Sequence, residues 1–306
     1  MNNIKRNFTG VKLCGILMIG AIAIAPAAGQ KAAPAVPDET NSTITVTGKN
    51  ADKDEVRREA RAFVGKAIVP EYGQFARRND PLCPTVIGID KSYADIVVTQ
   101  IRGVARNTGV KLAEPGCKAN VHVMFVNDSN GFMTKLGRAA PGVFSLVPAP
   151  ELKALRTSLV PVRWWYATEL EGSDRTKTSL VEQADRNSYL SVKSFSSSLI
   201  DSKITINLVG TIVVVDIEKA TGYPLASIGA YAAMVSLVQI KNGKDFSEAS
   251  SILNLFGPNQ TAANAPTDLT RWDYAFVSSL YEIPANRPGS VQKSQFATRM
   301  AAKLSQ

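Results

Sequence analysis

The chain has 306 residues, of which 45% are hydrophobic and 20% are charged, and its formal net charge at pH 7 is +9. Its single histidine, His122, excludes a zinc site of the His-Glu-x-x-His type, because that site needs two imidazoles four residues apart on one helix face. The sequence also contains no Gly-x-Ser-x-Gly nucleophile elbow, no Walker phosphate loop and no Gly-x-Gly-x-x-Gly after a predicted strand.

Residues 1–27 have the order of a secretory signal peptide. Three basic residues come first, an uncharged apolar run follows over residues 13–25, and small residues end the segment at Ala27. This order predicts cleavage near Ala27 and a periplasmic or secreted protein.

Two alternatives to a cleaved signal remain open. An N-terminal membrane anchor is one, although the run of thirteen residues is shorter than the ~20 residues that span a bilayer. A lipid-modified N-terminus is the other, but Cys14 lies at the front of the apolar run, whereas lipid attachment requires a cysteine at its end.

Cleavage after Ala27 removes three basic residues and no acidic residue, so the formal charge falls from +9 to +6. This balance favours anionic envelope polymers, lipid head groups or an envelope protein as partners. We expect no nucleic-acid partner, because export separates the protein from nucleic acid and no Lys/Arg stripe follows a predicted helix. The mature chain has no predicted transmembrane span.

Cys83 and Cys117 are the cysteines that remain after cleavage, and we predict that they form a disulfide in an oxidising compartment. Both lie in turn-rich segments, at 81–84 and 114–117. Closing a loop of about 35 residues stabilises a fold by roughly 3–4 kcal/mol. Two free buried thiols are the alternative.

The first half of the chain predicts a leader followed by alternating helices and strands. Helical spacing of apolar residues predicts a helix over 52–68 and another from Asp90, as N-cap, to Gly109. The remaining predicted segments are a flexible leader over 28–49 with a short strand at 43–48, a buried strand at 121–126 and short helices at 131–138 and 149–157. We therefore expect an N-terminal α/β part, residues 50–160, that contains the disulfide.

The second half, residues 161–306, predicts a C-terminal α/β part. Its predicted elements are a strand at 163–169, an exposed polar loop at 171–191, a strand at 204–217, an apolar helix at 224–240, a helix opened by a Thr270–Asp273 capping box and a last helix from Ser290. The predicted class is mixed α/β or α+β, with central strands packed on the buried helix 224–240.

Histidine and serine give weak catalytic signals. His122 lies between two valines on a predicted core strand, which favours a structural role over catalysis. Ser191, Lys193 and the serines at 196–198 supply the atoms of a serine–lysine arrangement, although serines in such runs are mostly solvated loop residues.

An aromatic strand beside two carboxylates is the other candidate site. Trp164, Trp165 and Tyr166 are candidate ligand-binding residues, and Glu169 and Glu171 share one strand face beside them. Paired carboxylates about 5–10 Å apart can hydrolyse glycosidic bonds. Buried aromatic packing with solvent-facing acids explains the same pattern. We predict no metal site and no cofactor.

Residues 204–285 carry a resemblance. The segment combines the strand 212–216, a turn at 220–222, the helix with Ala230-Tyr-Ala-Ala-Met234, Ser251-Ile-Leu-Asn254, Asp273 and Leu280-Tyr281. It resembles secreted proteobacterial proteins of unknown function, a group similar to metzincin-type zinc peptidases.

In such peptidases a buried helix carries the metal histidines, and a later Asp-x-x-x-x-x-x-Leu-Tyr helix packs beneath it. The corresponding positions here, 229–234, contain no imidazole and no acid. The resemblance therefore implies a peptidase-like scaffold without the metal, and a shared fold alone implies no activity.

Two functional hypotheses follow. The first is a non-catalytic binding or scaffolding domain of the cell envelope. The alternative is a metal-free hydrolase of envelope glycans that uses Glu169 and Glu171.

Overall fold

The computed structural model describes residues 53–68, 70, 73–174, 201–257 and 260–306, together with the backbone of 179–182 and 188–191. The predicted signal peptide, the leader, the strand at 43–48, Lys193 and the serines at 196–198 lie outside these residues. No helix within the described ranges has the length and apolar character needed to cross a bilayer.

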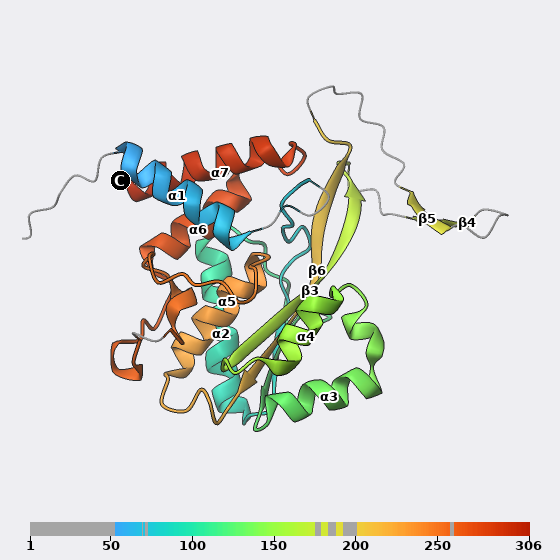
Figure 1. Ribbon diagram of the computed structural model, residues 1–306, viewed down its shortest axis with the longest axis vertical. Coiled ribbons are helices and arrows are strands. Elements are labelled where there is room, and N and C mark those ends of the chain that lie inside the picture. The colour runs from blue at the N-terminus through green and yellow to red at the C-terminus, as the bar shows by residue number, and fades with distance from the viewer. Residues whose placement is uncertain are drawn as a thin grey trace, which may run out of the picture. The chain divides into compact units, whose positions relative to one another are not determined.

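Four strands form a mixed sheet in the order β1-β2-β6-β3 (Figure 1). The strands β1 (Pro84–Ile87), β2 (Val121–Val126) and β6 (Ile204–Asp216) are parallel, and β3 (Val162–Gly172) pairs antiparallel with β6 at the sheet edge. Helices lie on both faces of this sheet, which confirms the mixed α/β class.

One face of the sheet packs against α2 (Lys91–Asn107) and α5 (Leu225–Leu237). Because successive side chains of a strand point to opposite faces, Val121, Val123 and Phe125 of β2 all enter this core. Val213 and Val215 of β6 do the same. The alternation thus fixes which side chains of β2 and β6 remain for the other face.

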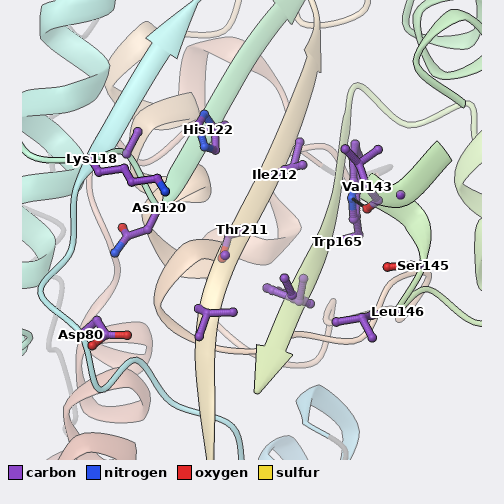
Figure 2. A pocket seen from close by; sticks show the side chains of 16 residues that line it. Asp80, Lys118, Asn120, His122, Val143, Ser145, Leu146, Trp165, Thr211 and Ile212 are labelled. Carbon is purple, nitrogen blue, oxygen red and sulfur yellow. Dashed lines mark hydrogen bonds between the residues drawn. The ribbon is translucent and has the colours of Figure 1, made fainter. Parts of the chain in front are cut away.

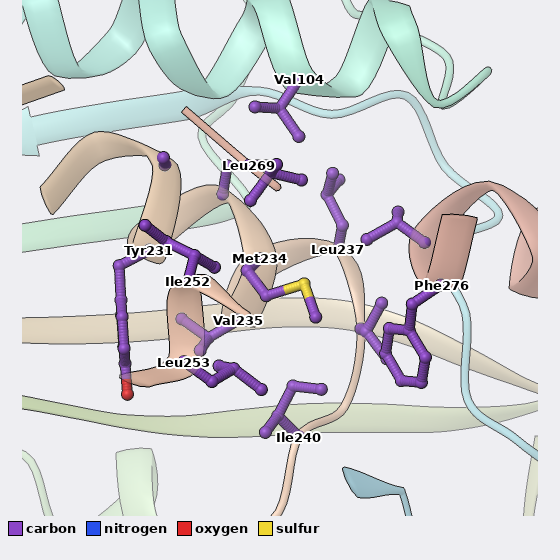
Figure 3. Packing of buried hydrophobic residues seen from close by; sticks show 14 of the residues in the cluster. Val104, Tyr231, Met234, Val235, Leu237, Ile240, Ile252, Leu253, Leu269 and Phe276 are labelled. Atoms are coloured by element: carbon purple, nitrogen blue, oxygen red, sulfur yellow. The ribbon is translucent and has the colours of Figure 1, made fainter. Parts of the chain in front are cut away.

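Helix α5 lies at the centre of the core, as its composition predicts. Every residue from Ser227 to Leu237 is buried, which a helix apolar on all sides requires. Figure 3 shows Met234, Val235 and Leu237 with Val104 of α2 and Phe276 of α6 (Arg271–Glu282) in the same cluster. The helix ends earlier than 240, because Val238 has extended dihedral angles.

The second face carries a smaller layer made of α3 (Ser129–Ala139), the short 3-10 helix η1 (Pro141–Phe144) and α4 (Ala149–Thr157). Its core consists of Met133, Phe144, Leu155, Trp165 and Val214. The predicted short helices at 131–138 and 149–157 correspond to α3 and α4.

A helical subcluster joins the two ends of the described chain. Helix α1 (Lys53–Ala67) packs with α6 and α7 (Gly289–Leu304), and the Phe63 ring meets the Phe276 ring edge-on with centroids 5.0 Å apart. The capping box at the start of α6 is confirmed. The Thr270 side chain accepts the backbone N–H of Asp273, and the Asp273 side chain accepts the backbone N–H of Thr270.

The disulfide prediction is confirmed. Cys83 and Cys117 are joined with an S–S distance of 2.00 Å, and the bridge ties the loop before α2 to the loop after it. The Cys83 carbonyl accepts the backbone N–H groups of Asn120 and Val121. The bridge therefore lies where β1 and β2 begin.

The loop predicted over 171–191 is wrong in part. Strand β3 continues to Gly172, and β4 (Ser179–Glu182) pairs antiparallel with β5 (Ser188–Ser191). Each segment contains a residue that favours strands, Val181 in β4 and Tyr189 in β5, although the flanking sequence is polar. Strand β1 was not predicted, because it is only four residues long and begins with a proline.

Candidate functional site

A cavity of about 520 Å³ lies on the second face of the sheet, beside the layer of α3, η1 and α4. Figure 2 shows the charged groups and the imidazole on one side, on β2 and the preceding loops, with Thr211 and Ile212 of β6 next to them. The other side, on β3 and around η1, is formed by Trp165, Val143, Ser145 and Leu146. The lining residues include Asp80, Lys118, Asn120, His122, Val143, Ser145, Leu146, Trp165, Tyr166, Ala167, Gly210, Thr211 and Ile212.

Strand register explains the hollow. His122 pairs with Ile212, and Ile212 pairs with Trp165, so these three side chains form one row across the face. The next β6–β3 pair on the same face, two residues along, is Gly210 with Ala167, next to a β-bulge. These small residues leave the space open, and a Cβ on Gly210 would lie only 3.3 Å from the Ala167 Cβ.

Asn120 supports the polar wall instead of offering free groups. Its side-chain oxygen accepts the Cys83 N–H at 2.8 Å, and its amide donates to the Pro81 carbonyl at 2.9 Å. Asn120 thereby fixes the disulfide loop against the start of β2.

Lys118 and His122 are the basic groups of this wall. The Lys118 side chain is exposed and the His122 side chain is half-buried. Within the described ranges, neither the ammonium nor the imidazole has a hydrogen-bond or ion-pair partner. Both are therefore available to a ligand.

Asp80 supplies the negative charge of the wall, and a polar network holds it. Its carboxylate accepts the Asn207 amide at 2.9 Å. The same amide donates to Glu171 at 2.8 Å, and the Asn79 amide donates to the other Glu171 oxygen at 2.9 Å. Asp80 thus joins the cavity to a buried cluster of amides and carboxylates.

A buried guanidinium lies behind the cavity. Arg78 is 4% exposed and donates to the Thr211 hydroxyl at 3.0 Å and to the Ser236 carbonyl at 3.2 Å. Burial lowers the pKa of Arg78, and Tyr281 and Asp80 act in the opposite direction. No carboxylate lies within ion-pair distance of Arg78 among the described residues.

The apolar wall is held in a fixed orientation. The Trp165 indole N–H donates to the Val143 carbonyl at 3.0 Å, and its ring centroid lies 5.0 Å from that of Phe144. Leu146 is 60% exposed and also lines a neighbouring cavity of about 330 Å³. The wall therefore combines a rigid indole with an accessible aliphatic side chain.

The three predicted aromatic residues lie on both faces of β3. Trp165 and Tyr166 line the cavity, but the Tyr166 hydroxyl donates to Val238 O at 3.0 Å and accepts Ile240 N–H at 2.9 Å. Burial raises the pKa of Tyr166 well above its usual value. Trp164 is buried on the α5 face, with its indole N–H 3.0 Å from the Ile240 carbonyl.

Glu169 and Glu171 are not among the residues that line this cavity. Glu171 is 3% exposed and both of its carboxylate oxygens accept side-chain amides, from Asn79 and Asn207. In the β3–β6 register Glu169 pairs with Asn207. The structure thus places Glu171 in a polar core.

Residues 229–234 of α5 are closely packed. All residues from Gly229 to Met234 are buried, and the Tyr231 ring meets that of Trp164 with centroids 5.8 Å apart. Below α5, the Tyr281 hydroxyl of α6 donates to the Leu237 carbonyl at 2.7 Å. In the part of the chain that the structure describes, no group of three or more His, Cys, Asp or Glu residues could hold a metal ion.

A serine–lysine–aspartate cluster outside the cavity has a structural geometry. The fully buried Ser129 hydroxyl donates to Asp216 at 2.5 Å, and Lys219 lies 2.9 Å from the same carboxylate. Burial raises the pKa of Asp216, but hydrogen bonds from Ser129 and Lys219 outweigh it and lower the pKa to about 2. The cluster anchors the start of α3 to the end of β6.

Lys118, Leu146 and Gly210 are site residues that sequence reasoning missed. The alternation of β2 gave one usable signal, since it places His122 on the face opposite to Val121 and Val123. Lys118 and Leu146 lie in loops, where no periodicity exists.

Comparison with protein-family models, curated proteins and solved structures gives no match for this chain.

Proposed function

We propose that this chain is a non-catalytic binding domain of the cell envelope and that the cavity over His122, Ile212 and Trp165 is its ligand site. One observation carries the proposal: an open cavity has, on one wall, two basic groups with no partner among the described residues and, on the other, mainly apolar side chains. Its volume of about 520 Å³ is typical of small-molecule sites, which range over about 300–1,000 Å³.

The envelope location rests on the export signal and has support from the disulfide. The bridge between Cys83 and Cys117 suits an oxidising compartment, where such bonds persist. The formal charge of +6 after cleavage favours anionic partners there.

The degenerate peptidase scaffold is also a proposal. It is supported by the position of α5 directly after β6, by its complete burial and by the contact of Tyr281 with Leu237 beneath it. Apolar residues and glycine fill the positions where a metzincin-type enzyme carries its ligands, so the scaffold would serve binding.

Elemental analysis and activity screening of the purified mature protein test the absence of catalysis. We expect substoichiometric metal and no turnover of peptides or peptidoglycan. Stoichiometric metal would overturn the proposal. Hydrolysis of peptidoglycan would also overturn the proposal if Glu169→Gln or Glu171→Gln abolished it and the exposed control Glu218→Gln left it unchanged. This result would favour the glycan-hydrolase alternative.

A further inference from the structure

We infer that the cavity binds a small amphipathic molecule with one anionic group, held by Lys118 and His122, and an apolar body against Leu146, Val143 and Ile212. The inference rests on the proposed function, because it assigns a ligand class to the same site. It is carried by the separation of polar and apolar groups across one cavity (Figure 2).

The anion position follows from the basic groups. A lysine ammonium offers three hydrogen-bond donors, and an imidazole N–H offers another. Lys118 and His122 lie on the same wall, and no carboxylate of the described residues pairs with either. A carboxylate or sulfonate between them would supply the missing acceptor and form charge-assisted hydrogen bonds.

The surrounding charges restrict the ligand to a single negative group. The buried Arg78 guanidinium behind Thr211 adds positive potential. At the other end of the wall the carboxylate of Asp80 adds negative potential, and the Asn207 amide stabilises this carboxylate with a hydrogen bond. A second anionic group near Asp80 would be repelled, so a monoanion fits better than a dianion.

The apolar body follows from the opposite wall. Trp165 is 2% exposed and its N–H is bonded to Val143, so the indole supports this wall from inside the core. The accessible apolar surface comes from Leu146 and from the half-buried Val143 and Ile212. Leu146 covers the same side and is 60% exposed. Burying it against the ligand would remove apolar surface from water.

A pair of fluorescent probes tests the inference on the full mature chain. Anilinonaphthalene sulfonate carries one anionic group, and phenylnaphthylamine is its uncharged analogue. We expect Lys118→Gln to weaken binding of the sulfonate about tenfold, as loss of one charge-assisted contact predicts. Binding of the uncharged probe should stay unchanged, Lys118→Arg should retain most affinity, and Lys135→Gln, an exposed lysine on α3, should have no effect.

Two further variants separate failure of the inference from failure of the proposed site. Ala167→Leu should fill the cavity and weaken binding of both probes. Leu146→Ser, at an exposed position, should also weaken binding of both probes by removing apolar surface, and it replaces Ala167→Leu if that variant does not fold. If these variants weaken both probes but Lys118→Gln weakens neither, the anionic ligand class is wrong and the cavity remains a site. If no folded cavity variant changes either probe, both the inference and the proposed ligand site are wrong.

Discussion

Asp216 shows how one buried carboxylate can depend on its hydrogen-bond donors. Its side chain is 3% exposed, and Ser129 and Lys219 hold its pKa at about 2, below the ordinary value of 3.8. A lowered carboxyl pKa stabilises the fold above the unfolded-state value and loses this contribution as pH falls from 3.8 towards 2. The shift corresponds to about 2 kcal/mol.

Substitution Asp216→Asn should therefore reduce the free energy of unfolding by about 2 kcal/mol at pH 7. Urea unfolding at pH 7 and near pH 2 measures the effect. The difference in the free energy of unfolding between wild type and variant should narrow near pH 2, where about half of the wild-type carboxylates are protonated. Glu218→Gln, at an exposed neighbour, is the control, and an equal gap at both pH values would contradict the assigned role of Asp216.

At this scale the sequence predicts some site residues and misses others for a definite reason. Trp165 and Tyr166 were predicted as ligand-binding residues and lie at the cavity, whereas Trp164 lies on the other face. Both tryptophans are buried, with 2% of Trp165 and 5% of Trp164 exposed. Consecutive aromatic residues on a strand must divide between two faces, and only the tertiary structure determines which face is hollow. The sequence around Lys118 contains no periodic pattern, because Lys118 lies in the loop after Cys117. Only the folded structure brings this loop to the cavity wall.

The contact between α2 and α5 is the element-scale feature with the sharpest steric consequence. A Cβ at Gly229 of α5 would lie 3.0 Å from the Gln100 Cβ and 3.4 Å from the Val97 Cα, so the two helices approach closely there. A Cβ at Gly103 of α2 would have no atom within 4 Å.

Gly229→Ala should therefore destabilise the protein by about 1–3 kcal/mol through overpacking. Gly103→Ala should leave it unchanged or stabilise it by about 0.5–1 kcal/mol, because glycine inside a helix costs conformational entropy. Thermal unfolding of the two single variants gives the comparison. Equal destabilisation by both would refute the close approach of α2 and α5.

The disulfide links elements that are distant in sequence. Cys83 and Cys117 are 34 residues apart, and the double variant Cys83→Ser/Cys117→Ser should lose about 3–4 kcal/mol of stability. Chemical denaturation with and without reductant measures this loss. Reductant should destabilise the wild type and leave the double variant unaffected. If the wild type keeps its stability although both cysteines have been shown to be reduced, the disulfide does not stabilise the fold.

Periodic elements were readable from the sequence and short strands were not. Helices α1, α2, α6 and α7 follow a helical spacing of apolar residues, and their predictions are confirmed. Helix α5 and strands β2, β3 and β6 were predicted from long apolar or aromatic runs, and these predictions are also confirmed. Strands β1, β4 and β5 have four residues each, which is too short for a period to emerge. Their pairing partners supply the stabilisation that their own sequences do not show.

The cavity is a property of the whole molecule. It requires the register that aligns His122, Ile212 and Trp165, the small pair Gly210 and Ala167, and a second helical layer that contributes Leu146 beside them. No segment of the sequence contains more than part of this arrangement. The site therefore could not be predicted before the order β1-β2-β6-β3 was known.

Nuclear magnetic resonance of His122 tests the proposed binding site most directly. The chain has one histidine, so its imidazole signal is unambiguous, and the three tryptophan indole signals can be assigned by Trp→Phe substitution. Titration with anilinonaphthalene sulfonate should shift the signals of His122 and Trp165 saturably. The Trp164 indole, bonded to Ile240 on the opposite face, should not move. If the probe binds saturably but the signals of His122 and Trp165 do not shift, the assignment of this cavity as the ligand site is contradicted.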